Sequence, residues 1–174
     1  MQGKSSARSL KPMIKLGPHP VPPQPGSYAL VFKILINRHL TVGKLGAADF
    51  KRGFYVYFGS ARGSGGLVAR IRRHLQDKQR LHWHIDYLTQ AAPVHEFWYT
   101  LDPESREHAW ARLCRGRPGW ETAFRRFGAS DCDCPAHLFR AVKKKDVDDL
   151  YKALRADAEN REQRIQRRPA VDFA

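Results

Sequence analysis

Residues 55–88 begin Y-V-Y-F-G-S-A-R-G-S-G-G-L-V-A-R-I-R-R-H-L and, after a short basic turn, end H-W-H-I-D-Y-L. The run 54–58 is entirely aromatic or β-branched, which is typical of a strand. A Gly/Ser loop follows, and then Leu67, Ile71 and Leu75 recur at helical spacing among arginines. The stretch therefore predicts a strand, a flexible loop and a basic helix.

Two more strands are expected before this stretch. Residues 26–36 alternate, and one face would carry Tyr28, Leu30, Phe32, Ile34 and Ile36. A turn follows, and 39–42 reads as a partner strand. Because short connections join these two segments to the strand at 54–58, we expect a three-stranded antiparallel meander.

Both helices and strands are expected in the second half of the chain. Helices are expected over 85–90, over 106–114 and from 146 onward. Ser105 is the expected N-cap of the middle one. Residues 94–100 and 137–142 are strand candidates, and the Arg/Glu/Gln-rich end after Ala158 is expected to fray.

These elements divide the chain into three parts. Residues 1–25 form a basic arm that is expected to be disordered, because six prolines fall between residues 12 and 25. Residues 26–142 form the domain, and 143–174 form a C-terminal helix and a basic tail. The predicted class is α+β, with a small three-stranded antiparallel sheet flanked by helices.

Charge is the strongest global property of the sequence. The formal net charge is +14, and the first acidic residue is Asp49. Such a field attracts polyanions, so we expect a nucleic acid as the partner and no membrane. No apolar run approaches the roughly 18 residues of a membrane span. Three cysteines are too few for a disulfide framework, which favours a reducing cytoplasm.

The basic helix also carries reactive groups. Arg70 and His74 lie four residues apart, one turn of helix, and Tyr57 ends the preceding strand. Phosphodiester cleavage requires a proton acceptor, a charge clamp and an orienting group or acid, and a phenol, a guanidinium and an imidazole can supply them. The alternative is that the tyrosine only packs and the arginine only positions phosphates.

These segments resemble a known family. G-S-Y (26–28), Y-F-G-S-A (57–61) and R-I-R-R-H (70–74) are similar to the motifs of the GIY-YIG nuclease superfamily. Together with G-K-L-G, W-H-I-D-Y-L and F-G-A-S-D-C-D-C-P-A-H-L-F, they resemble one prokaryotic branch of it. That branch is a DUF123-like domain of poorly characterised function, found alone or attached to endonuclease III-type repair enzymes.

The resemblance implies a metal-dependent endonuclease that hydrolyses DNA, with structured or damaged DNA in repair as the expected substrate. The residues it implies as catalytic are Tyr28, Tyr57, Arg70 and His74, and Glu107 is implied as the ligand of one Mg²⁺ or Mn²⁺ ion. We add His84, because one histidine of H-W-H is expected to face the site. The basic residues expected to contact nucleic acid are Arg62, Arg72, Arg73 and Lys78. RNA stays open as a substrate.

One family feature is missing. Many relatives carry an asparagine after the glutamate, whereas the asparagines here, Asn37 and Asn160, are not placed for that role. Asp131 or His137 could take its place. A non-catalytic nucleic-acid-binding module on the same fold is therefore the alternative function.

A zinc site is disfavoured by the spacing. Cys132, Cys134 and His137 read C-x-C-x₂-H, but structural zinc takes four ligands and usually a wider cysteine spacing. Cys114 is the only cysteine left to complete the set. The sequence instead favours a turn in which the two thiols pack.

Overall fold

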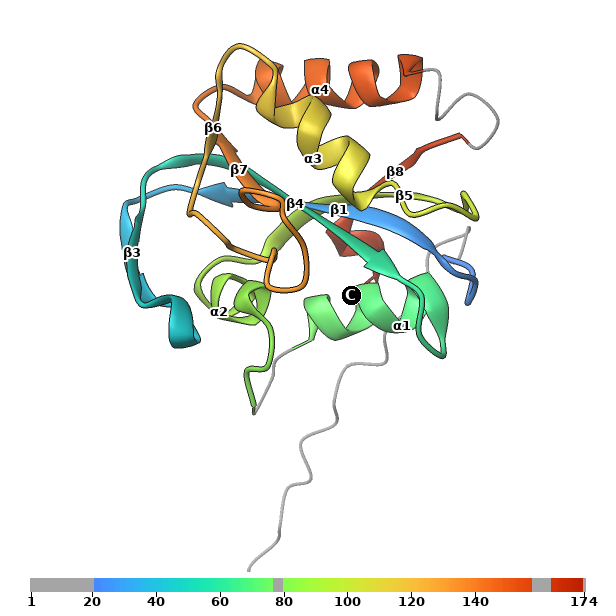
Figure 1. Cartoon of the computed structure of the whole chain (residues 1–174), viewed down its shortest axis with the longest axis horizontal. Helices are drawn as coiled ribbons and strands as arrows, with labels where there is room; N and C mark the ends of the chain where they lie inside the picture. Colours follow the sequence, from blue (N-terminus) through green and yellow to red (C-terminus); the bar gives the residue numbers. More distant parts are fainter. Residues whose placement is uncertain (1–20, 77–79, 158–163, 174) are drawn as a thin grey trace, which may run out of the picture.

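A six-stranded antiparallel sheet forms the centre of the computed structural model, which describes residues 21–76, 80–157 and 164–173 (Figure 1). The strand order is β6-β7-β4-β1-β5-β8. The bounds are β1 Gly26–Ile34, β4 Gly53–Ala61, β5 Val94–Thr100, β6 Trp120–Thr122, β7 Leu138–Ala141 and β8 Gln166–Pro169. The α+β class is confirmed, whereas the expected number of three strands is wrong for this sheet.

The expected meander of three consecutive strands is also wrong, because the second strand does not join the main sheet. β1 pairs with β4 along its whole length, from Gly26 opposite Ala61 to Ile34 opposite Gly53. β2 (Arg38–Thr41) instead pairs with β3 (Ala47–Phe50) in a separate two-stranded sheet, and the short 3-10 helix η1 (Gly43–Leu45) joins them. β2 is mostly exposed, and Leu40, its one apolar side chain, is only partly buried against the core, so the strand has little to gain from joining the main sheet.

Strand β1 is buried on both faces, because helices cover both faces of the sheet (Figure 1). Leu30 and Phe32 pack in the cluster that holds α1 (Gly66–Leu75) and α2 (His84–Ala91). Ala29 and Val31 pack on the other side, in the cluster that holds α3 (Glu107–Arg115) and α4 (Lys144–Ala156). The alternation predicted for β1 thus separates two hydrophobic clusters.

Residues 166–173 form regular structure, although the segment after Ala158 was expected to fray. β8 pairs with β5, and Arg167 on β8 donates to Glu96 at 2.8 Å and to Asp148 at 2.7 Å. These carboxylates compensate the arginine charge at the sheet edge, so a polar segment can pair as a strand. A 3-10 helix, η3 (Ala170–Phe173), follows. Residues 1–20 of the expected arm (1–25) and residues 158–163 lie outside the described residues, whereas Val21 is buried in the core. Of the helices that are described, none is long and apolar enough to cross a membrane.

Candidate functional site

The phenol of Tyr28 meets the imidazole of His74 in the interior. The Oη atom of Tyr28 on β1 lies 2.8 Å from Nε2 of His74 on α1, and both side chains are almost fully buried. Gly59 lies directly opposite Tyr28 on β4. A Cβ at Gly59 would lie 2.5 Å from Oη of Tyr28, so only glycine leaves room for this ring. The glycine of Y-F-G therefore serves the tyrosine of G-S-Y.

Tyr57 shares the electrostatic environment of Tyr28. Burial raises the pKa of Tyr28 well above its ordinary value, and the nearby Tyr57 raises it further. Burial also raises the pKa of Tyr57, and the Glu107 carboxylate adds to the effect. The Arg70 guanidinium lowers the pKa of both phenols. Both tyrosines are therefore protonated at neutral pH, and Arg70 is the cation that favours their ionisation.

Arg70 sits on an aromatic platform at a hollow in the surface. Its Cζ lies 4.2 Å from the centre of the Trp83 ring, and Cζ of Arg73 lies 4.4 Å from the same ring. The pocket here measures about 280 Å³, and its lining comes from the Gly/Ser loop, α1 and Trp83: Ala61, Gly63, Ser64, Gly66, Ala69, Arg70, Arg73 and Trp83. The loop and the basic helix quoted first thus form one concave, positively charged surface.

The basic residues expected to bind nucleic acid have different surroundings. Arg73 donates to the buried Asp86 at 2.8 Å, and Asp86 also accepts the backbone N–H groups of His82 and Trp83, which directly precede α2. Arg62 is exposed and donates to the carbonyl of Pro103. Arg72 is partly buried on α1. Lys78 lies outside the described residues. A nucleic-acid role for these four stays a prediction.

His84 holds a loop. Its Nδ1 accepts the backbone N–H of Gly128 at 3.1 Å, and burial lowers its pKa, which keeps the ring neutral. Gly128 in turn lies against Tyr57, because a Cβ there would be 2.6 Å from Cε2 of that ring. His84 therefore connects to the phenols through the loop between β6 and β7, and its direct participation stays a prediction.

Glu107 is the first residue of α3. Burial alone would raise the pKa of this carboxyl, but hydrogen bonds to His137 and Ser60 hold it below its ordinary value. Nδ1 of His137 lies 2.7 Å from Oε1 of Glu107. The carboxylate is thus ionised at neutral pH, where a divalent cation could use it.

The start of α3 is fixed from the sheet. Ser105 is not its N-cap as expected: the helix begins one residue later, with Arg106 in that position. The backbone N–H of Arg106 donates to Oγ of the buried Ser27 at 2.8 Å. The middle residue of G-S-Y therefore anchors the helix that carries Glu107. Because Ser27 and Tyr28 are consecutive, strand β1 contacts both the start of α3, which carries Glu107, and His74 on α1.

The residues considered for the missing asparagine are separated. Asn37 accepts the N–H of Arg52 beside the β2–β3 sheet, and Asn160 lies outside the described residues. Asp131 is exposed, whereas His137 contacts Glu107. Of the two substitutes, His137 is the one that reaches the glutamate.

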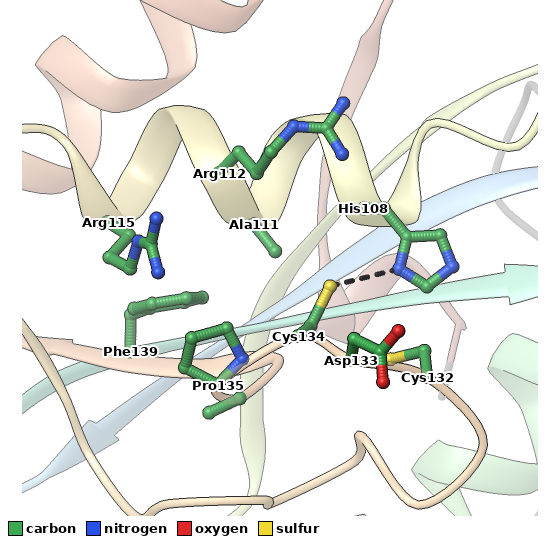
Figure 2. A pocket seen from close by; sticks show the side chains of 10 residues that line it. His108, Ala111, Arg112, Arg115, Cys132, Asp133, Cys134, Pro135 and Phe139 are labelled. Carbon is green, nitrogen blue, oxygen red and sulfur yellow. Dashed lines mark hydrogen bonds between the residues drawn. The ribbon is translucent and has the colours of Figure 1, made fainter.

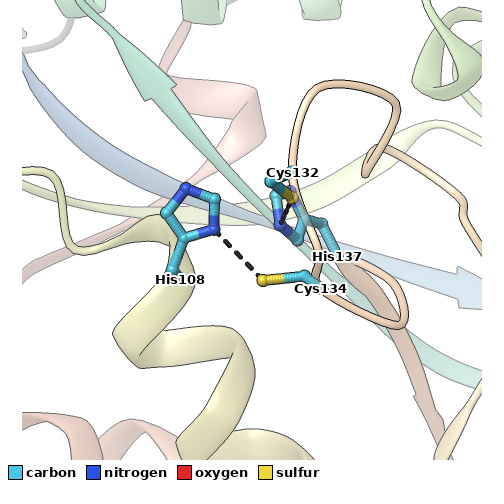
Figure 3. A group of neighbouring side chains, drawn as sticks. All are labelled: His108, Cys132, Cys134 and His137. Carbon is cyan, nitrogen blue, oxygen red and sulfur yellow. Dashed lines mark hydrogen bonds between the residues drawn. The ribbon is translucent and has the colours of Figure 1, made fainter.

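His108 is a residue that the sequence argument missed. Together with Cys132, Cys134 and His137 it forms a group whose ligand atoms all lie within 4.8 Å of one another and could hold a metal ion (Figure 3). The expected fourth partner, Cys114, is fully buried in the cluster beneath α3 and α4. The signal for His108 was its position next to Glu107, on the helix that faces the cysteine loop.

A family model matches residues 27–159, and its description is Domain of unknown function DUF123. The chain belongs to this family. The DUF123 match ends after α4 and spans both groups of residues described above. The tyrosine group is Tyr28, Tyr57, Arg70 and His74, and the His/Cys group is His108, Cys132, Cys134 and His137. No curated protein and no solved structure matches the chain.

A second hollow of this DUF123 domain adjoins the His/Cys group. It measures about 440 Å³, and its lining includes Arg112 and Arg115 of α3 beside Cys132 and Cys134 (Figure 2). The phenyl ring of Phe139 and the neighbouring Pro135 give it an apolar wall. Both hollows therefore have arginines in their lining.

Proposed function

We propose that this chain is a metal-dependent endonuclease of the GIY-YIG type that hydrolyses phosphodiester bonds in DNA, with structured or damaged DNA as its substrate class. One observation carries the proposal: the 2.8 Å contact between Tyr28 and His74, in the same electrostatic field as Tyr57, Arg70 and Glu107. These five residues are the ones that the family resemblance implies. His84, which the sequence also predicts to be catalytic, would act only indirectly, through the loop between β6 and β7.

The Tyr28–His74 pair offers a route for the proton of the attacking water. A buried phenol with a raised pKa is a poor source of phenolate, so Tyr28 needs an acceptor for its own proton. In the proposed step, the water oxygen bonds to phosphorus and its proton passes to Oη of Tyr28. The phenolic proton of Tyr28 moves at the same time to Nε2 of His74. The bond from phosphorus to the leaving oxygen breaks, and solvent protonates that oxygen.

Arg70 would stabilise the negative charge of the phosphate. Its guanidinium is held on Trp83 at the rim of the pocket, and its charge already lowers the pKa of both phenols. A fixed cation at this position would stabilise the charge that develops on the equatorial phosphate oxygens. Tyr57, on the neighbouring strand, would orient the water.

Glu107 would hold the divalent cation. Its carboxylate is ionised and adjoins the phenols, which fits a single Mg²⁺ or Mn²⁺ whose other positions are filled by water and substrate phosphate. When bound, the ion would supply Lewis-acid stabilisation of the leaving oxygen. The net charge of +14 would supply affinity for DNA that does not depend on sequence. The expected compartment is the cytoplasm.

A second function is favoured by a different observation. Glu107 is already engaged by His137 and Ser60, and Arg70 is stacked on Trp83. In a non-catalytic nucleic-acid-binding module, these contacts would be purely structural and Arg70 would only position phosphates. The two functions differ in what the loss of Arg70 changes, cleavage in one case and binding in the other.

The test compares Arg70→Ala with Arg38→Ala, which removes the same charge from the exposed β2 strand. End-labelled single-stranded, duplex, flap and four-way-junction DNA would be incubated with each protein and Mg²⁺ or Mn²⁺. For an endonuclease, Arg70→Ala lowers the cleavage rate about 10²- to 10³-fold, and salt-dependent binding changes as little as in Arg38→Ala. Tight binding by wild type without cleavage of any substrate would instead establish the binding module.

A further inference from the structure

We propose that His108, Cys132, Cys134 and His137 bind one structural zinc ion, and that Glu107 orients His137 as its ligand. The inference rests on the geometry of these residues, and it stands whether or not the chain cuts DNA. The four side chains come from two separate parts of the chain, helix α3 and the loop between β6 and β7, and they point toward one another (Figure 3).

The distances within the group suit tetrahedral zinc. Nδ1 of His108 lies 3.1 Å from Sγ of Cys134, and Nε2 of His137 lies 3.5 Å from Sγ of Cys132. Zinc bonds of about 2.3 Å to sulfur and about 2.0–2.1 Å to nitrogen place tetrahedral neighbours about 3.4–3.8 Å apart. The four ligand atoms lie within 4.8 Å of one another, so small side-chain shifts would close the shell.

The second ring nitrogen of His137 faces a carboxylate. Its Nδ1 lies 2.7 Å from Oε1 of Glu107, whereas its Nε2 faces Cys132. A small rotation of the ring would turn this contact into the carboxylate–histidine hydrogen bond that fixes the tautomer of a zinc ligand and leaves the other nitrogen for the metal. Glu107 therefore lies between the two groups of the molecule, because it also acts on the phenol of Tyr57.

The loop that carries the cysteines is held in shape by the protein. Arg126 donates to the carbonyls of Cys132 at 2.6 Å, Ser130 at 3.4 Å and Cys134 at 3.4 Å. The N–H of His137 donates to the carbonyl of Phe127, whose ring is fully buried. A close C-x-C spacing can serve a metal here, because the arginine and the buried ring set the loop conformation in place of a wider cysteine spacing.

The donor set selects the kind of metal and its role. Two thiolates and two imidazoles suit zinc, whereas Mg²⁺ prefers oxygen ligands. Four protein ligands leave no open position for water, which is typical of a structural site. Binding releases the two thiol protons, so a Zn²⁺ ion with two thiolates adds no net charge to this partly buried place. The ion would join α3 to the loop that contacts Tyr57.

The full-length chain, without a metal-binding tag and with its thiols reduced, would first be assayed for zinc by mass spectrometry. The protein would then be stripped with a chelator and titrated with Co²⁺, which reports tetrahedral thiolate ligation by intense visible and charge-transfer bands. The ligand variants are Cys132→Ser, Cys134→Ser and His108→Asn. Cys114→Ser and His95→Asn are the matched controls, since one is buried elsewhere and the other is exposed on β5.

We expect one zinc ion per chain in the wild type and in both controls, and loss of zinc in the three ligand variants. Glu107→Gln should retain the ion with affinity weakened about 10- to 100-fold in chelator competition. The wild-type Co²⁺ spectrum tests the site even where a variant does not fold. A wild type without zinc and without cobalt–thiolate bands would overturn the proposal. So would equal zinc in Cys132→Ser and Cys114→Ser, or a Cys132–Cys134 disulfide in the reduced, zinc-supplied protein.

Discussion

The tyrosine group and the His/Cys group of this molecule are built in opposite ways. Tyr28 lies on β1, and Arg70 and His74 lie on α1, which directly follows β4, the strand that pairs with β1 along its whole length. His108 lies on α3, whereas Cys132 and Cys134 lie in the long loop between β6 and β7, outside the strand pairing. The first group rests on a pair of long strands, whereas the second rests on a helix and a loop, where a metal ion would add a direct link.

Glu107 shows that the two groups are not independent. It contacts His137 of the His/Cys group and raises the pKa of Tyr57 in the tyrosine group. Gly128 adds a steric link, because a Cβ there would lie 3.2 Å from both Cβ of His137 and Oη of Tyr57. A change in the His/Cys group should therefore alter the surroundings of the tyrosines. The predictions below run from the largest expected effect to the smallest.

The largest effect is expected from removing the metal. A ligand that binds only the folded state, at a thousand times its dissociation constant, stabilises by about 4 kcal/mol. For a domain of this size we expect chelation under reducing conditions to lower Tm by about 8–16 °C, and Zn²⁺ to restore it. Differential scanning calorimetry measures this. An unchanged Tm after complete metal removal would show that the His/Cys group, like the tyrosine group, keeps its structure without a metal ion.

The second effect comes from the tight contact beneath Tyr28. In Gly59→Ala the new methyl would meet the phenol ring at about 2.5 Å, so the ring must move away from His74. We expect a loss of about 1–3 kcal/mol in the free energy of unfolding, together with lost cleavage. Gly63→Ala is the control, because nothing lies within 4 Å of its added Cβ. Denaturant unfolding of both variants checks the prediction, and equal stabilities would contradict it.

Sequence reasoning reached further in one group than in the other. The spacing of Arg70 and His74 predicts a shared helix face, and alternation along β1 predicts the face of Tyr28; both describe neighbours a few residues apart. His108 and Cys134 are far apart in sequence, and their contact depends on how α3 packs against a loop. No local pattern encodes such a distance. The polar strand β8 was missed for the same reason, since its ion pairs join Arg167 to residues on β5 and α4.

The smallest effect concerns the alkaline limit of stability. Burial raises the pKa of Tyr55 to about 12, although Arg140 acts in the opposite direction. Its stabilising contribution is complete below its unfolded-state pKa near 10, and is lost as the pH rises through the folded-state value. We expect Tyr55→Phe to flatten the fall of stability between pH 10 and about 12 by up to one proton per molecule. Unfolding at a series of pH values measures the slope, and an unchanged slope would contradict it.

The most direct test of the account is single-turnover cleavage by Tyr28→Phe beside Tyr55→Phe. Both variants lose one buried phenolic oxygen, but that of Tyr55 bonds the carbonyl of Lys51 whereas that of Tyr28 meets His74. With Mg²⁺ and branched or duplex DNA, we predict cleavage that falls at least about 10²-fold in Tyr28→Phe and stays near wild type in Tyr55→Phe. If Tyr28→Phe cuts as fast as wild type, the tyrosine group is not the catalytic centre.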